Sequence, residues 1–268
     1  MRFSIITPVM NGMPWLRACV ESVDAQRASA EVEHIVLDGG STDGSREYLR
    51  ASAPRATLIF EPDGGQTDAL DRGIRLATGD VVAWLNADDL YPVGALRAVA
   101  EAFSAHPDAV AVAGACLFLD EAENILSVAL PPRECSLAGL LRSPNNPPQP
   151  SVFFRREAYL ACGGLDRRFD LAMDVDLWMK LALRGTIVPL GETVLSHFRV
   201  REGAKSFRQA AAAAREDLSI RRSHQMPLLS RAGVVLLRDG YLYAVLRPVY
   251  RRLVKPLLGG ARHAVAQK

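Results

Sequence analysis

This sequence is organised around the stretch Asp80-Val81-Val82-Ala83-Trp84-Leu85-Asn86-Ala87-Asp88-Asp89. It begins as the apolar run of a buried strand and ends in two adjacent carboxylates, which repel each other and resist burial. One economical use of such a pair is a hard-cation site that also holds a phosphate-bearing ligand. Asp88 or Asp89 can equally cap a helix that starts near Pro92. Taken alone, the segment supports metal binding and helix capping about equally.

Short apolar runs alternate with amphipathic segments through the first half of the chain. Strands are expected over residues 3–7, 32–37, 57–60, 80–85, 109–119 and 151–154. Helices are expected over residues 14–26, 43–51, 66–77, 92–105 and from about 173 to 184. This alternation predicts an α/β fold, a mostly parallel twisted sheet with helices on both faces.

Parallel sheets bind ligands at the carboxyl ends of their strands. Four segments rich in Gly, Asp, Asn or Pro fall at these ends: residues 8–13, 38–45, 61–66 and 86–89. One such loop is commonplace as a turn, whereas four on one sheet edge indicate a shared site. The Pro/Asn-rich stretch 143–150 is too rigid for a helix and is expected to form a surface loop over this site.

Several single residues have both a structural and a functional interpretation. Asp38 follows a strand and can accept a hydrogen bond from a nucleobase or ribose, whereas Asp43 is better explained as a helix cap. Asp174 starts a helix, where it suits either capping or a general base at the lip of a pocket. His197 and Arg199, on a late strand, can touch a diphosphate or a metal, although a lone histidine is more often structural.

Five motifs occur in order along the chain, and together they are specific although each alone is weak. They are Ser4-Ile5-Ile6-Thr7-Pro8-Val9-Met10-Asn11-Gly12, Asp38-Gly39-Gly40-Ser41-Thr42-Asp43-Gly44-Ser45, Glu61-Pro62-Asp63-Gly64-Gly65, Trp84-Leu85-Asn86-Ala87-Asp88-Asp89, and Gly163-Gly164-Leu165-Asp166 followed by Asp174-Val175-Asp176-Leu177-Trp178. Through them, residues 2 to about 208 resemble a family-2 glycosyltransferase with the GT-A fold, of the kind that builds bacterial surface polysaccharides.

The resemblance implies a nucleotide-sugar donor and assigns contacts to it. Pro8, Asn11 and Asp38 match the segments that hold the nucleotide, with Asp38 matching the acid that meets the base. Asp63 and Asp68 match positions that line the nucleotide-sugar pocket.

The resemblance also implies the chemistry. Asn86-Ala87-Asp88 matches the family's Asp-x-Asp motif, with Asp88 as metal ligand and Asn86 facing the ribose, and Asp174 matches the catalytic base. The implied reaction is inverting. A divalent cation, Mn²⁺ or Mg²⁺, neutralises the departing nucleoside diphosphate, and Asp174 deprotonates the acceptor hydroxyl that attacks the anomeric carbon.

Two positions depart from the family's pattern. Asn86 replaces the usual first aspartate, which predicts weaker attraction for a metal. Arg199-Val200-Arg201 puts an arginine where the family often has a histidine near the metal. Three arrangements stay open: His197 serves as the ligand, water completes the site, or Arg201 contacts phosphate directly. Arg199 and Arg201 are both candidate contacts to the nucleotide sugar.

The net charge of +2 hides an asymmetry. Residues 221–268 hold ten Lys or Arg and one acid, Asp239, a charge of +9, so residues 1–220 carry −7. We therefore divide the chain into a glycosyltransferase domain, 1–220, and a basic, mostly helical extension, 221–268. The extension is expected to attach to the inner face of the cytoplasmic membrane, near lipid-linked acceptors, or to pack on the domain or on a second subunit. Few aromatic residues argue against nucleic acid.

The remaining features favour a cytoplasmic enzyme. The four cysteines are scattered without a C-x-x-C pair, the N-terminus runs straight into a strand, and no apolar stretch approaches the roughly 18 residues of a membrane span. We expect sugar transfer from a nucleoside-diphosphate sugar, UDP-linked, to a saccharide or lipid-linked acceptor. The alternatives are a non-catalytic nucleotide-sugar- or glycan-binding scaffold and a sugar-nucleotide pyrophosphorylase, whose Gly-rich, Arg-bearing first loop is not found at residues 7–12.

Overall fold

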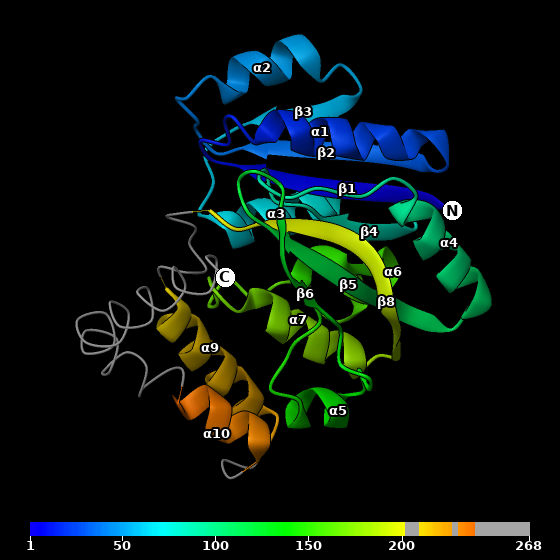
Figure 1. Ribbon diagram of the computed structural model, residues 1–268, viewed down its shortest axis with the longest axis vertical. Coiled ribbons are helices and arrows are strands. Elements are labelled where there is room, and N and C mark those ends of the chain that lie inside the picture. Colours follow the sequence, from blue (N-terminus) through cyan, green and yellow to red (C-terminus); the bar gives the residue numbers. More distant parts are fainter. Residues whose placement is uncertain (202–208, 227–229, 239–268) are drawn as a thin grey trace, which may run out of the picture.

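The computed structural model describes residues 1–201, 209–226 and 230–238. Its centre is one sheet, formed by β1 (Arg2–Val9), β2 (Glu31–Asp38), β3 (Ala56–Phe60), β4 (Val81–Trp84), β5 (Ala109–Leu119), β6 (Ile125–Ala129), β7 (Val152–Arg155) and β8 (Thr186–Arg199). The strands are ordered β3-β2-β1-β4-β7-β5-β6, and β8 pairs with β5. Figure 1 shows this sheet running through the middle of the molecule, with helices around it.

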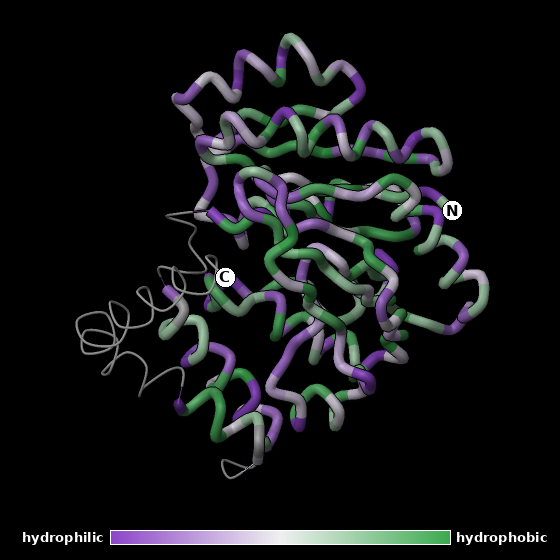
Figure 2. Tube along the Cα trace, in the orientation of Figure 1, coloured by the Kyte–Doolittle hydropathy of each residue, from purple (hydrophilic) through white to green (hydrophobic). Residues whose placement is uncertain are grey.

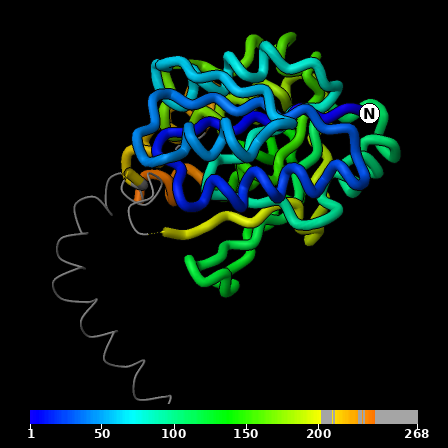
Figure 3. The backbone as a smooth tube through the Cα atoms, turned by 90° about the horizontal axis from the view of Figure 1, so that it is seen from above, coloured from blue at the N-terminus to red at the C-terminus, as the bar shows by residue number. Residues whose placement is uncertain are grey.

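The first four strands are all parallel, as the alternation of strands and helices predicts. The second half of the sheet is mixed, because β7 runs antiparallel to both of its neighbours, β4 and β5. β5 and β6 form an antiparallel hairpin, which projects from the body of the molecule in Figure 3. Strand β6 is not expected from the sequence, because its side chains are mostly exposed and lack the apolar-in, polar-out alternation of a half-buried strand.

Helices cover both faces of the sheet, as expected. They are α1 (Leu16–Ala25), α2 (Ser45–Ser52), α3 (Gln66–Leu76), α4 (Ala95–Ala105), α5 (Leu137–Arg142), α6 (Arg156–Ala161), α7 (Met173–Ala182), α9 (Ala210–Ser223) and α10 (Arg231–Leu237), with 3-10 turns η1 (Gln26–Ala28) and η2 (Gln149–Ser151). The apolar strands stand out at the centre of Figure 2. On one face α3, α6 and α7 pack against β1, β4 and β7, where the rings of Trp84 and Trp178 stack with centroids 5.6 Å apart. On the other face α1 and α4 pack on the same strands.

One local expectation needs correction. Helix α4 begins at Ala95 with Gly94 as its N-cap, so neither Asp88 nor Asp89 caps it. Helix α5 was not expected from the sequence; it lies just before the Pro/Asn-rich stretch 143–150, and its N-cap Ser136 accepts a hydrogen bond from the backbone N–H of Gly139. The apolar stripe of so short a helix is hard to recognise among prolines.

The described part of the basic extension packs against the rest of the chain. The expected domain boundary after residue 220 falls inside α9, and α10 packs on α9 through Leu218, Ala232 and Leu236. Residues 239–268, which carry most of the extension's charge, lie outside the described residues. Across the described ranges, no helix combines the length and the apolar character needed to cross a bilayer.

Gly73 brings α3 close to the sheet and provides a test of this packing. A methyl group added there would lie 2.6 Å from Cγ2 of Ile6 and 2.8 Å from Cδ1 of Leu37. Gly73→Ala is expected to lower the free energy of unfolding by about 1–2 kcal/mol, because overpacking outweighs the roughly 1 kcal/mol gained in helix propensity. Chemical denaturation measures this, with Leu76→Ala, exposed on the same helix, as the control. A Gly73→Ala protein as stable as the unmodified one would contradict the close packing.

Candidate active site

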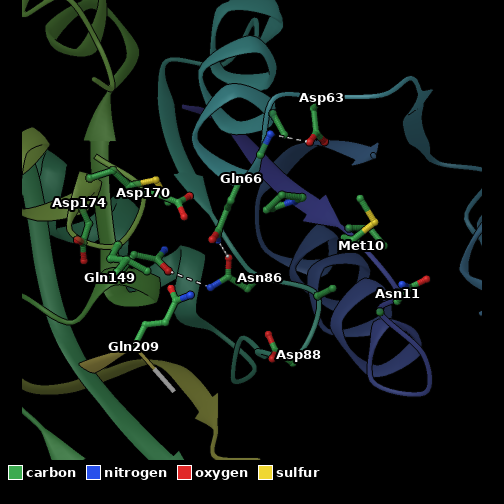
Figure 4. Close-up of a pocket in the computed structure, with 18 of the residues that line it drawn as sticks. Met10, Asn11, Asp63, Gln66, Asn86, Asp88, Gln149, Asp170, Asp174 and Gln209 are labelled. Carbon is green, nitrogen blue, oxygen red and sulfur yellow. Dashed lines mark hydrogen bonds between the residues drawn. The ribbon is translucent and has the colours of Figure 1, made fainter. Parts of the chain in front are cut away.

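A cavity of about 590 Å³ opens at the carboxyl ends of β1 and β4. This volume lies within the range of about 300–1,000 Å³ that is usual for small-molecule sites. Seven residues singled out from the sequence line it: Pro8, Asn11, Asp63, Asn86, Asp88, Asp174 and Arg201. The loops after β1, β3 and β4 therefore meet at one place. Figure 4 shows Asp63, Asn86 and Asp88 around the cavity, whereas the side chain of Asn11 extends outward and accepts a hydrogen bond from the backbone N–H of Thr42 (2.9 Å).

The loop after β2 does not line the cavity but supports the loop after β1. Asn11 has a φ of 55°, a left-handed conformation that asparagine tolerates, and its backbone N–H donates to Oγ of Ser41 (2.8 Å). The carboxylate of Asp43 accepts hydrogen bonds from the backbone N–H groups of Met13 and Ser45. Asp43 thus holds the start of α2 from the position before the cap, because Gly44 rather than Asp43 is the N-cap.

Asp38 is fully buried behind this support. One of its oxygens accepts hydrogen bonds from the backbone N–H groups of Gly40 and Ser41 and from Nε of Arg46, the last at 2.6 Å. Burial by itself raises the pKa of Asp38, but these hydrogen bonds outweigh it and hold the pKa below its usual value. The other oxygen, Oδ2, is buried and has no partner in the described structure. A buried acceptor of this kind is costly unless a donor meets it.

Three amide side chains form a row across the cavity floor. Nε2 of Gln66 donates to Oδ1 of Asn86 (2.8 Å), and Nδ2 of Asn86 donates to Oε1 of Gln149 (3.2 Å). Gln149 in turn donates to the backbone carbonyl of Trp84 (2.9 Å). Figure 4 shows this row, which fixes the orientation of the Asn86 amide inside the cavity.

Asp88 and Asp89 play different parts despite being adjacent. Oδ2 of Asp88 accepts a hydrogen bond from Nε of Arg201 (2.7 Å), and both side chains are partly exposed. Asp89 is fully buried and accepts from the backbone N–H of Arg199 (3.2 Å), so it attaches the end of β8 to this loop. Burial, with the charge of Asp88 adding to it, raises the pKa of Asp89 well above its usual value. Asp88 therefore faces the cavity, and Asp89 is structural.

Asp174 is the second residue of α7 and lies on another side of the cavity from Asp88 (Figure 4). Its Oδ1 accepts a hydrogen bond from the backbone N–H of Val175 (2.9 Å). Burial raises the pKa of Asp174 to about 6, and the nearby charge of Asp217 adds to the effect. A carboxylate with a pKa near neutrality, at the edge of a cavity, is suited to take a proton in catalysis.

Known proteins with a similar sequence show the family to which the chain belongs. The family described as Glycosyl transferase family 2 matches residues 4–130. An uncharacterised glycosyltransferase of Mycobacterium tuberculosis is 33% identical over 181 residues, which cover 67% of this chain and 68% of that protein. The chain belongs to glycosyltransferase family 2. This assignment favours a sugar transferase over the scaffold and the pyrophosphorylase considered as alternatives.

Solved structures show the same fold for this glycosyltransferase. S. aureus TarS 1–349, in complex with UDP-GlcNAc, has a TM-score of 0.64 at 16% identity, over 95% of this chain and 76% of that one. The mannosyltransferase PcManGT from Pyrobaculum calidifontis, in complex with GDP-Man and Mn²⁺, has a TM-score of 0.64 at 20% identity, over 99% and 80%. At these identities the likeness concerns the fold, and it confirms the expected GT-A architecture.

The side chains around Asp88 can hold a divalent cation in one way. Magnesium is commonly bound through one or two carboxylates together with substrate phosphates, and Asp88 supplies one carboxylate facing the cavity. In the described ranges, no group of three or more His, Cys, Asp or Glu side chains is arranged around a metal position. The donor set thus fits a cation whose other ligands come from a diphosphate and water, provided that Arg201 leaves Asp88.

His197 and Arg199 were expected to contact a diphosphate or a metal, but the alternation of side chains along β8 turns both away from the cavity. Phe198 of β8 lines the cavity, so its neighbours on either side point away from it. Arg199 is only 2% exposed, and it pairs with Glu123 (2.8 Å) and lies 4.4 Å from the ring centroid of Trp15. His197 is half-buried and bridges Leu90 through its backbone. The structure therefore brings Arg201 to the cavity and leaves His197 and Arg199 outside it.

Asp68 lies next to the cavity rather than in its wall. It lines a smaller pocket of about 220 Å³, pairs with Arg167 (2.7 Å) and accepts from the backbone N–H of Gly64 (3.0 Å). Its expected role at the nucleotide sugar is indirect in this arrangement, because it holds the loop that carries Asp63.

Several cavity residues were not singled out from the sequence: Gln66, Gln149, Asp170, Met173, Phe198 and Gln209. Gln149 had the clearest signal, since it lies in the Pro/Asn-rich stretch expected over the site. Gln66 follows the Gly64-Gly65 turn directly and is the first residue of α3. It therefore lies where the loop after β3 joins that helix. Gln209 precedes α9 and could be located only from the tertiary structure.

Proposed function

We propose that this glycosyltransferase is an inverting enzyme. It moves a sugar from a nucleoside-diphosphate sugar, UDP-linked, to a hydroxyl of a saccharide or lipid-linked acceptor in cell-surface polysaccharide synthesis. The observation that carries the proposal is the convergence of Asp88 and Asp174 on one cavity that the loops after β1 and β3 also line. A carboxylate for the diphosphate's cation and a second one for the acceptor are the two charged groups that the reaction needs.

The donor's nucleotide is proposed to lie over the loop after β1. Pro8, Asn11 and Asp63 line this part of the cavity. The unpaired Oδ2 of Asp38 is buried behind this loop, and an N–H of the base would meet it only after the loops after β1 and β2 move apart. Support for a nucleotide-sugar donor comes from the structural neighbours, which were solved with UDP-GlcNAc and GDP-Man.

The donor's diphosphate is proposed to lie between Asp88 and Arg201. Asp88 would hold a divalent cation, which when bound neutralises charge on the departing diphosphate. The guanidinium of Arg201, released from Asp88, would donate to phosphate oxygens, for which its planar fork is suited. Asn86 lies beside them and is proposed to face the ribose.

Asp174 is proposed to be the general base. It takes the proton of the acceptor hydroxyl while that oxygen forms a bond to the anomeric carbon. The bond from the anomeric carbon to the diphosphate oxygen breaks, and the electron pair leaves with the nucleoside diphosphate. Because attack and departure are on opposite sides of this carbon, the configuration inverts.

The pH dependence of turnover should report the ionisation of Asp174. Its pKa is raised to about 6, and the base must be ionised, so kcat/KM should rise with pH through about 6 and level off above it. Measuring kcat/KM over a series of pH values, with the cation at a saturating concentration, tests this. A limb near pH 4, where an ordinary aspartate titrates, would contradict the buried base.

A donor screen tests the function itself. Purified protein is mixed with UDP-, GDP- and other nucleotide sugars, with Mn²⁺, Mg²⁺ or EDTA, and the thermal unfolding midpoint and sugar release are measured. We expect one class of donor to raise the midpoint in the presence of a cation and to be turned over. If none does either, the sugar-transfer proposal fails.

The basic extension is proposed to attach the enzyme to an anionic membrane surface. Each basic residue near such a surface contributes up to about 1 kcal/mol. Replacing Arg251, Arg252 and Lys255 by Glu in the full chain should therefore weaken binding to anionic vesicles by about 100-fold or more. The control replaces three exposed arginines elsewhere: Arg55, Arg97 and Arg133. Equal weakening in both proteins would show general attraction rather than a role for the extension.

A further inference from the structure

Helix α9 lies against α7, the helix that carries Asp174 (Figure 1). Ile220 of α9 packs with Val175 and Met179 of α7. Gln209, just before α9, and Ala213 within it line the cavity. The family match ends at residue 130, so this helix lies outside the part of the chain that the match covers.

Glu216 of α9 binds the backbone that leads into α7. Its Oε2 accepts hydrogen bonds from the N–H groups of Leu171 (2.9 Å) and Ala172 (3.0 Å). These two N–H groups belong to the N-cap residue, Ala172, and to the residue before it, so they lie outside the hydrogen bonds of the helix and need other partners. A carboxylate on a different helix therefore fixes the two residues that stand just before Met173 and Asp174.

Asp217, the next residue of α9, belongs to a buried junction. It pairs with the fully buried Arg221 one turn later, and its Oδ2 accepts from Nδ2 of Asn146 (3.0 Å). Arg221 also donates to the backbone carbonyls of Leu140 and Ser143. Through this junction α9 is attached to the stretch that carries Gln149, as well as to the helix that carries Asp174.

The charges that face Asp174 come from several elements. On α9, Asp217 acts on it electrostatically and adds to the effect of burial. On its own helix, Asp176 is paired with Lys180 (2.6 Å). Across the cavity, Asp88 is paired with Arg201, and Asp170 lines the cavity just before α7.

We propose that Glu216 is a positioning residue that holds Asp174, through the start of α7, in the place that proton abstraction requires. The inference rests on the proposed role of Asp174 as base. Glu216 does not line the cavity. It fixes the backbone before Asp174, and its neighbour Asp217 attaches α9 to the stretch that carries Gln149.

Three variants of the full chain test Glu216. Glu216→Ala should lower kcat by about 10- to 100-fold, because a displacement of about 1 Å at a reacting group is enough for such a loss. The donor KM should change by less than about twofold, since Glu216 contacts only the backbone before α7 and none of the residues proposed to hold the donor. Glu216→Gln keeps an oxygen that accepts both N–H groups and should restore most of kcat. Arg222→Gln, exposed on the same helix, is the control and should match the unmodified protein.

Asp217 is tested by a pH profile. Asp217→Asn removes a negative charge that faces Asp174, so the acidic limb of kcat/KM should move to lower pH. The thermal unfolding midpoint shows whether the variant is folded. If Asp217→Asn does not fold, the Glu216 series still decides, because that carboxylate is partly exposed and replaceable.

Hydrogen exchange separates this inference from the function. Amides in a peptide covering residues 169–175 should exchange faster in Glu216→Ala than in Arg222→Gln, whether or not a donor is turned over. If Asp174→Asn loses turnover while Glu216→Ala keeps the unmodified kcat and exchange, the positioning proposal is overturned and the base assignment stands. If exchange changes as expected but Asp174→Asn is fully active, the base assignment fails. The contact of Glu216 with the backbone before α7 then has no catalytic role.

Discussion

Asp174→Asn should reduce sugar transfer by about 10²- to 10⁴-fold, the usual contribution of a positioned acid or base. Asparagine fills the same space and can still accept from the N–H of Val175, so α7 should keep its start. It cannot take a proton from the acceptor. The loss should appear in kcat, with the donor's thermal shift preserved, because the donor contacts lie across the cavity.

The control for this variant is Asp108→Asn, an exposed aspartate away from the cavity. Donor hydrolysis and transfer should be measured separately, since water can still reach the anomeric carbon without a base of the right geometry. An Asp174→Asn enzyme with unchanged transfer would refute the base assignment. Asp170, which lines the same cavity, would then be the next candidate for the base.

Asp88→Ala should lower turnover by at least about 10²-fold, comparable to removing one group that stabilises charge developing in a transition state. It removes the carboxylate proposed to hold the cation, so the dependence of the donor's thermal shift on Mn²⁺ should also disappear. Arg201 loses its partner at the same time. The freed guanidinium can still bind a diphosphate, and cation-independent donor binding should persist weakly.

Arg201→Ala is the informative companion to Asp88→Ala. If Arg201 binds the diphosphate, its removal raises the donor KM. If it acts mainly as an internal counter-ion to Asp88, its removal lowers the Mn²⁺ concentration needed for half-maximal activity. Asp108→Ala serves as the control, and full activity of Asp88→Ala would overturn the proposed cation site.

Much of the fold and part of the site could be predicted from local patterns. The runs Val81-Val82-Ala83 and Ile5-Ile6 mark buried strands, and the turn residues after them mark strand ends. Since the carboxyl ends of parallel strands meet at one edge, Asn11, Asp63 and Asp88 could be assigned to one cavity.

The features that could not be predicted depend on tertiary structure, which no local sequence pattern contains. The direction of β7 depends on how the chain returns to the sheet, and residues 151–154 read the same either way. His197 and Arg199 were chosen on chemistry, but the face of β8 that meets the cavity is set by its register with β5. Phe198, between them, is the residue that this register turns inward.

The cap proposed for Asp88 or Asp89 failed for a similar reason. The chain makes a further turn through Pro92 before α4 starts, and Gly94 takes the N-cap position with a φ of 83°. Glu216 shows the converse: it supplies hydrogen-bond acceptors to the start of a helix that lies more than forty residues before it in sequence.

In the enzyme without ligands, the positive charge of Arg201 neutralises the negative charge of Asp88 through their ion pair. A free cation must displace an arginine, and a free phosphate must draw that arginine from its carboxylate, so each is a weak ligand by itself. A nucleotide sugar with its cation satisfies both partners at once. In the proposed function, donor and cation therefore strengthen each other's binding by the same factor, as linkage requires. Such an enzyme binds the complex of nucleotide sugar and cation tightly, and it binds free phosphates or free metal ions only weakly.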